Sequence, residues 1–190
     1  MAELSEALSR IKVGLESLGR DALLVALRPG LAPEDVGRQL NSAGLPDDAE
    51  VEALYEWCDG TQTAGVTLDD IHLFPGFYLL SLEDAVANYR AFVADPRWSS
   101  GWLPVFANGG GDFYLVDLGE QPSGRVRHFR IDETEHPVEF RSLSDMAATL
   151  AAAFDRGVFF VDPDGYLEME DLRFATLAAE MNPAVPWWTD

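Results

Sequence analysis

Apolar side chains recur at helical spacing at the start of the chain. They predict an amphipathic helix over residues 3–18 that ends at Gly19. A short second helix is expected over residues 21–28, before a Pro-Gly pair. A third is expected over residues 33–43, because a proline and two acids stand in its first turn. The chain therefore opens with a helical region.

The next segments mix helix and strand signals. Asp47 is the expected N-cap of a helix whose apolar stripe runs to Cys58, and residues 61–70 are polar enough for a loop. Short apolar runs at 71–74 and 77–80 predict two strands around a Pro-Gly turn.

A helix and then a block of strands follow. Ser81 resembles the first residue of a capping box, so we expect a helix from there until Asp95-Pro96. The strands are expected at residues 102–107, 112–118, 125–131 and 138–140. Turn residues separate neighbouring strands, which is typical of antiparallel hairpins.

The last part of the chain returns to helices. Ser142 is the expected cap of a helix that ends at Gly157, and a final helix is predicted over residues 171–181. Between them lie a short apolar run, 158–161, and a strong turn signal at 162–165. Helices, then strands, then helices predict an α+β fold with a central antiparallel sheet of about four to six strands flanked by helices.

The charge balance narrows the classes of partner. The chain has 190 residues, with 33 acidic side chains, 13 basic side chains and a net charge of −20. Such a surface repels nucleic acid and anionic lipid, so we expect no nucleic acid and no membrane among the partners. It would attract a basic protein and speed the encounter. Solubility alone explains the charge equally well.

A few sequence features indicate the cellular compartment of the protein and whether it can form a disulfide. The acidic start of the chain lacks the apolar stretch of a secretion signal, and no apolar run is long enough to cross a membrane. The single cysteine, Cys58, excludes an intramolecular disulfide and falls on the apolar stripe of its helix. We expect a cytoplasmic protein.

Candidate catalytic and cofactor sites are weak. The glycine run 109–111 precedes a strand and has no nearby lysine, so it reads as a hairpin turn and not as a phosphate loop. His128 and His136 flank several acids, but they lack the spacing of a metal-binding helix. No nucleophile elbow is present. We expect no enzyme, no cofactor, no metal site and no catalytic residue.

Acidic residues gather in three short segments of the chain. These segments are the candidate partner-binding residues, although each also fits an ordinary solvated face. They are Asp47, Asp48, Glu50 and Glu52; Asp132, Glu133 and Glu135; and Glu168, Glu170 and Asp171.

A series of motifs resembles the SUKH superfamily, which includes Smi/Knr-like regulators of fungal cell-wall synthesis and many bacterial immunity proteins. Each motif is short, but their order and spacing together carry the resemblance. They are LRPG at 27–30, LPDD at 45–48, LYEWCDG at 54–60, LFPGF at 73–77, LSLEDA at 80–85, GWLPV at 101–105, NGGGD at 108–112, VDL at 116–118 and SLSDM at 142–146.

The resemblance implies a SUKH (Smi/Knr-like) domain over residues 27–157. Residues 1–26 would be an N-terminal helical extension, and residues 158–190 a C-terminal extension packed on the same domain. The C-terminal segment resembles a long bacterial branch of the superfamily.

The implied function is that of a protein-binding module without enzymatic activity. The expected role is an immunity protein whose acidic surface neutralises a basic toxin domain, and nucleases are one class of such toxins. A regulatory scaffold that binds a cellular protein is the alternative, and a small metal-dependent hydrolase that uses His128 and His136 is a third.

Overall fold

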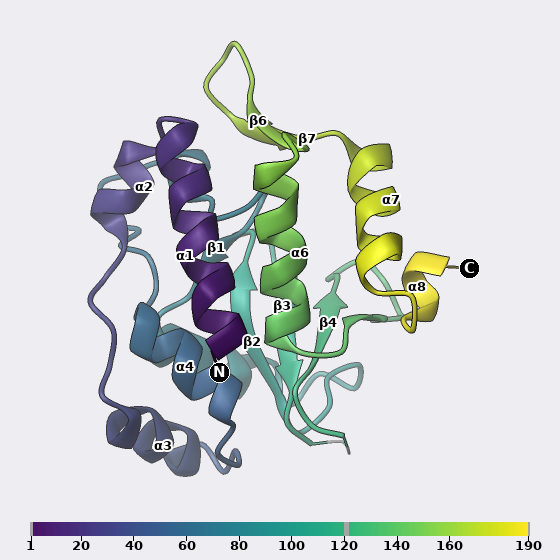
Figure 1. Cartoon of the computed structure of the whole chain (residues 1–190). Coiled ribbons are helices and arrows are strands. Elements are labelled where there is room, and N and C mark those ends of the chain that lie inside the picture. The colour runs from purple at the N-terminus through teal and green to yellow at the C-terminus, as the bar shows by residue number, and fades with distance from the viewer. Residues whose placement is uncertain (1, 120–121, 190) are drawn as a thin grey trace.

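The computed structural model describes residues 2–119 and 122–189 and is shown in Figure 1. The elements, in chain order, are α1 (Ala2–Ser17), α2 (Asp21–Ala26), α3 (Pro33–Ser42), α4 (Ala49–Trp57), η1 (Asp69–Ile71, a 3₁₀ turn), β1 (Tyr78–Leu79), α5 (Leu82–Phe92), β2 (Trp102–Ala107), β3 (Phe113–Asp117), β4 (Arg125–Phe129), β5 (Val138–Phe140), α6 (Leu143–Asp155), β6 (Phe159–Val161), β7 (Leu167–Met169), α7 (Asp171–Met181) and α8 (Pro186–Thr189).

The centre of the fold is a five-stranded sheet. Its strands lie in the order β1-β2-β3-β4-β5, and each neighbouring pair is antiparallel. The register between β2 and β3 shifts between Pro104 and Phe106. A proline cannot donate a hydrogen bond to its neighbour, so this irregularity lets it sit inside a central strand. The α+β class with a central antiparallel sheet is confirmed.

Helices cover both faces of this sheet. Neighbouring strand residues point to opposite faces, so Phe113 and Tyr114 mark the two sides. Phe113 meets Phe92 of α5, with ring centroids 5.2 Å apart. Tyr114 shares a cavity wall with Met146 of α6. Helix α5 therefore covers one face and α6 the other, and α1 packs beside α6 (Figure 1).

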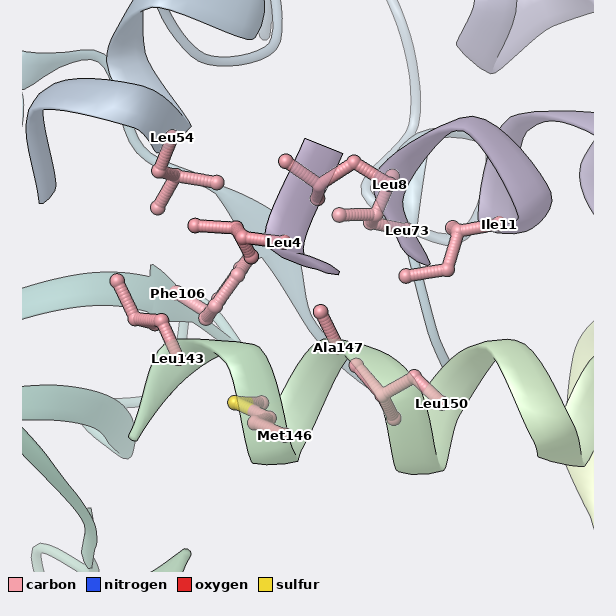
Figure 2. A pocket seen from close by; sticks show the side chains of 10 residues that line it. All are labelled: Leu4, Leu8, Ile11, Leu54, Leu73, Phe106, Leu143, Met146, Ala147 and Leu150. Atoms are coloured by element: carbon pink, nitrogen blue, oxygen red, sulfur yellow. The ribbon is translucent and has the colours of Figure 1, made fainter. Parts of the chain in front are cut away.

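The first helix belongs to the main hydrophobic core. Figure 2 shows side chains from α1, α4 and α6 meeting above Phe106 of the sheet. The space left between them is about 10 Å³, which is no larger than one water molecule needs. The α1 residues Leu4, Leu8, Ile11 and Leu15 are buried. The helix is thus held by packing and not by its own propensity.

Side-chain caps fix where several helices begin. Asp48, and not the predicted Asp47, caps α4: its Oδ1 accepts hydrogen bonds from the backbone N–H groups of Glu50 and Val51 at 3.0 and 3.1 Å. Asp47 instead accepts a hydrogen bond from Asn41 Nδ2 at 3.1 Å. Ser81 and Ser142 cap α5 and α6 as predicted.

Two local predictions were wrong or incomplete. The run 71–74 forms no strand: Ile71 is the last residue of η1, and the following residues enter a tight turn in which Phe74 and Phe77 make an isolated bridge. The turn at 162–165 joins β6 to β7, an antiparallel hairpin outside the main sheet, and only its turn was predicted. The hairpin projects beyond the ends of α1 and α6 at the top of Figure 1.

Candidate protein-binding surface

Arginines on the surface are largely engaged by carboxylates of the same chain. Ion pairs join Arg10 to Asp155, Arg28 to Asp59, Arg38 to Asp35, Arg97 to Asp95, Arg141 to Asp145, Arg156 to Glu180 and Arg173 to Glu170. The negative charge that remains lies on other acids, so the position of those acids decides where a basic partner is attracted.

The first acidic segment is partly structural. Asp48 is the cap of α4, as described above. The Glu50 carboxylate accepts hydrogen bonds from the backbone N–H groups of Leu143 and Ser144, at 2.8 and 3.3 Å, and from the Ser144 hydroxyl. It therefore occupies the amino end of α6, where an anion is favoured. Asp47 is exposed and Glu52 is half-buried.

The second segment lies in the connection between β4 and β5. Asp132, Glu133 and Glu135 are all exposed there. Arg97 donates to the backbone oxygens of Ile131 and Glu133, so the connection is tied to the rest of the protein through its backbone. Its carboxylates project from a surface loop, and none of them lines a described cavity.

The third segment contributes to a groove. Glu168 and Asp171 lie beside Asp69, which comes from a distant part of the chain, and the space between them is about 290 Å³. Glu170 lies outside and pairs with Arg173 at 3.6 Å. We call this feature the hairpin groove, and its lining residues are Asp69, His72, Pro75, Gly76, Tyr166, Leu167, Glu168, Met169 and Asp171.

An imidazole lies in the wall of the hairpin groove. His72 is 9% exposed, and its Nδ1 is 3.9 Å from Asp69 Oδ1. Its Nε2 has no hydrogen-bond partner within the described residues. Burial lowers the pKa of His72, Asp69 raises it, and the Arg20 charge lowers it further. The net direction is downward, so the ring is neutral near pH 7.

The hairpin beside the groove is held in a defined shape. Asp162 Oδ1 accepts the backbone N–H groups of Asp164 and Tyr166 at 2.9 and 2.8 Å. Gly165 adopts a φ of 93°, which favours glycine. Arg20 donates to the backbone oxygen of Gly165 at 3.0 Å and also to that of Asp69. Arg20 thus joins the two walls of the groove, and sequence reasoning did not identify it.

An aromatic side chain stands next to these acids. Tyr166 is 46% exposed although it is large and mostly apolar. Exposed tyrosines of this kind are frequent anchors in protein interfaces. The hairpin groove therefore combines three carboxylates, a neutral imidazole and an exposed ring.

A second, larger groove has mixed charge. It encloses about 800 Å³ near the amino end of α6, and its wall contains Glu3, Glu50, Arg125, Arg141 and Asp145. Two arginines offset its acids, and Glu50 is already bound to α6. This groove is a weaker match to a basic partner than the hairpin groove.

The histidines considered for metal chemistry lie on opposite faces of the sheet. His128 stacks on Tyr114, whereas His136 packs on Phe129, and His128 and Phe129 are neighbours in β4 that point to opposite sides. Across the ranges that the structure describes, no group of three or more His, Cys, Asp or Glu side chains is placed to hold a metal ion.

Arg127 of β4 and Arg130 just after it are also bound internally. Arg127 contacts Asp117 at 2.9 Å and lies over the ring of Trp102, 5.3 Å from its centre. Arg130 contacts Glu139 at 3.1 Å and lies over the ring of Trp187, 5.0 Å from its centre. These contacts hold two of the three arginines that lie between residues 125 and 130.

The architecture described above is a five-stranded antiparallel sheet with helices on both faces. A family model described as the SMI1/KNR4 family (SUKH-1) matches residues 44–154. The chain belongs to this family. No curated protein matches the chain.

Membership indicates a protein-binding role, in immunity or in regulation, and members of the SMI1/KNR4 family are generally not enzymes. Within the described ranges, none of the helices combines the length and the apolar character needed to cross a membrane.

Proposed function

We propose that the protein is an immunity protein that neutralises a basic toxin domain by binding it at the hairpin groove. A nuclease is the favoured toxin class, because an active site that holds phosphate is itself basic. Binding would block that site sterically and would require no covalent change in either protein. The cytoplasm is the proposed place of action.

The observation that carries the proposal is the composition of the groove. Asp69, Glu168 and Asp171 surround a space large enough for an arginine side chain. A guanidinium group donates pairs of hydrogen bonds to carboxylates, which makes arginine the best partner for this arrangement. Tyr166 would pack against the partner beside the charged contact and exclude water from it.

The net charge of −20 supports the same proposal. An excess of one sign speeds the approach of an oppositely charged partner, and salt weakens this attraction. The three acidic segments would all contribute to this long-range attraction, whereas only the groove would hold the partner in place. The two contributions are separable by experiment.

The test compares two double variants that remove the same charge. Glu168→Gln with Asp171→Asn changes the groove, and Asp132→Asn with Glu133→Gln changes the exposed β4–β5 connection. Binding to a purified toxin domain encoded beside this gene is measured by surface plasmon resonance at low and high salt, which gives both the affinity and the association rate. We expect the groove variant to bind at least about tenfold more weakly and the control to change mainly the association rate. Equal affinities for the two variants would disprove binding at the groove.

The regulatory scaffold remains the alternative, because the family includes both roles. It predicts the same groove with a cellular enzyme or signalling protein as its occupant. Co-expression distinguishes the two: an immunity protein restores growth to cells that express the toxin domain, and a scaffold does not.

A further inference from the structure

The second strand of the hairpin has one edge without a neighbouring strand. β7 pairs with β6 in a two-stranded sheet, and no third strand joins them among the described residues. Residues 166–169 are consecutive and all line the hairpin groove, whereas none of the described β6 residues does. Successive strand residues point to opposite faces, so a space above one face would be lined by alternate residues only. The groove therefore runs along the edge of β7 that faces away from β6.

The hydrogen bonds of the hairpin decide which backbone groups face this edge. The backbone N–H of Asp162 donates to the oxygen of Tyr166 at 2.9 Å, and that of Glu170 donates to the oxygen of Val158 at 3.1 Å. Bonded and non-bonded pairs alternate along an antiparallel ladder. Glu168 lies midway between these two bonded pairs, so its own backbone groups also point toward β6.

Leu167 and Met169 are the β7 residues between the bonded pairs. Their backbone N–H and C=O groups point away from β6, along the groove. Among the described residues, neither is hydrogen-bonded by a group outside the hairpin. Met169 is half-buried and Leu167 is 3% exposed, so Met169 is the more accessible of the two. A strand edge with unpaired backbone groups is a template for another chain.

The opposite wall of the groove leaves this edge open. It contains Pro75 and Gly76, which form a turn closed by a hydrogen bond from the Phe77 N–H to the Phe74 oxygen at 3.0 Å. The turn thus bonds to itself, and a space of about 290 Å³ separates it from β7. A short extended segment of another protein can enter there.

The side chains of β7 define the sequence that such a segment needs. Residues directly opposite each other on neighbouring strands place their side chains on the same face, with Cβ atoms about 4.5–5.5 Å apart. Glu168 is exposed, and no ion pair engages it within the described ranges, so it favours a basic residue opposite. Leu167 and Met169 point to the other face, where Met169 and Phe174 line one internal cavity. They favour apolar residues opposite.

We propose that the hairpin groove receives an extended segment of the partner protein as an added strand on β7, with an apolar–basic–apolar sequence. The partner residue opposite Met169 exchanges both backbone hydrogen bonds with it, and the basic side chain lies beside Glu168 and the Tyr166 ring. Backbone bonds of this kind give affinity, and the alternating side chains give specificity. The inference rests on the proposed function only in taking the groove as the place where a protein partner binds.

Hydrogen–deuterium exchange of single amides, followed by NMR, tests the edge in the free protein. The Met169 amide should exchange at least about tenfold faster than the Glu168 amide, because only the Glu168 amide is bonded across the hairpin. The two are neighbours in one strand, so each controls for the other. Equal protection of the two amides would mean that the edge is already covered, and the proposal would be wrong.

The binding test uses the peptide TVRVT, acetylated and amidated at its ends, as the probe. In the added strand its valine N–H groups face β7 and its arginine N–H faces away. We expect saturable binding that slows exchange of the Met169 amide. A methyl group on the nitrogen of the second valine should weaken binding at least about tenfold, and the same group on the arginine nitrogen by less than about threefold. Absent binding, or equal weakening by the two methyl groups, would disprove the added strand.

A second peptide tests the charge. Citrulline in place of the arginine keeps the shape of the side chain and removes its positive charge, so it should weaken binding at least about threefold. An unchanged affinity would overturn the assignment of the basic residue to Glu168.

The same exchange measurement on the complex with the toxin domain separates this inference from the proposed function. Protection of the Met169 amide in the complex would support both. If the toxin domain binds at the groove while the Met169 amide still exchanges fast, the added strand is wrong and the immunity role remains. If the peptide binds as expected and no toxin domain does, the immunity role is wrong and the added strand remains.

Discussion

Glu50 of α4 binds the first residue of α6: its Oε2 accepts a hydrogen bond from the backbone N–H of Leu143 at 2.8 Å. The two residues are 93 positions apart in the chain, so this contact joins the helical first half to the second half. An acid in the most acidic part of the sequence thus acts within the fold, which makes its contribution to stability testable.

Replacing Glu50 with alanine should lower the free energy of unfolding by about 1–3 kcal/mol, because the buried end of α6 loses its acceptor. Urea unfolding measures the change. Glu52→Ala on the same helix is the control and should change stability by less than about 0.5 kcal/mol. If both variants lose the same stability, the contact of Glu50 with α6 is not important for the fold.

The role of Arg20 in joining the groove walls can be tested without removing an acid. Arg20→Met keeps much of the side-chain packing but removes the donors to Gly165 and Asp69. We expect faster hydrogen–deuterium exchange in residues 162–166 and weaker binding at the groove. Arg38→Met is the control, because Arg38 is exposed and pairs with Asp35 on its own helix. Unchanged exchange at 162–166 in the Arg20 variant would contradict the assignment.

Helix α1 should be essential for stability although it lies outside the residues that match the family. Leu8→Ala removes a fully packed side chain and should cost about 2–5 kcal/mol. Val13→Ala on the same helix is the control, because Val13 is 59% exposed. Thermal and urea unfolding measure both. If Leu8→Ala behaves like the control, α1 is a dispensable extension.

Stability should fall as the pH drops from about 7 to 5. Burial lowers the pKa of both His72 and His136 in the folded protein. The unfolded chain then binds more protons than the folded chain below the ordinary histidine pKa of about 6.5, so stability is present above that pH and is lost as the pH falls toward the lowered values.

His72→Asn should flatten this dependence in part, and the double variant with His136→Asn should flatten it further. Unfolding free energies measured from pH 8 to pH 5 give the slope. The pKa of Asp95 is about 2, so its contribution to stability is lost only below pH 5. It therefore does not affect the slope measured between pH 8 and pH 5. A slope that is unchanged in the double variant would show that other groups cause the loss.

Much of the architecture could be predicted from local patterns. The final long helix lies at Asp171–Met181 and β5 at Val138–Phe140, and both match the predicted ranges. The strand expected at 71–74 failed because its apolar residues are buried under a turn and are not paired in the sheet. Burial and strand pairing leave the same apolar signal in a short segment.

The residues of the hairpin groove could be predicted from the sequence only in part. Density of acids along the chain pointed to Glu168 and Asp171, but it gave no means of separating them from Glu50, which binds a helix end. Asp69 joins them from about a hundred positions away, and Arg20 connects the walls from still farther. Such contacts depend on the tertiary fold, and a single sequence carries no local sign of them.

The two walls of the hairpin groove, which Arg20 joins, come from distant parts of the chain. This has a consequence for the order in which the groove forms during protein synthesis. One wall of the hairpin groove is made early, with Asp69, and the other only when Glu168 and Asp171 have been added near the end of the chain. A nascent polypeptide on the ribosome lacks the assembled groove until residues 168–171 have been translated. Any ligand that recognises the assembled groove will therefore ignore fragments of the chain that end before Glu168.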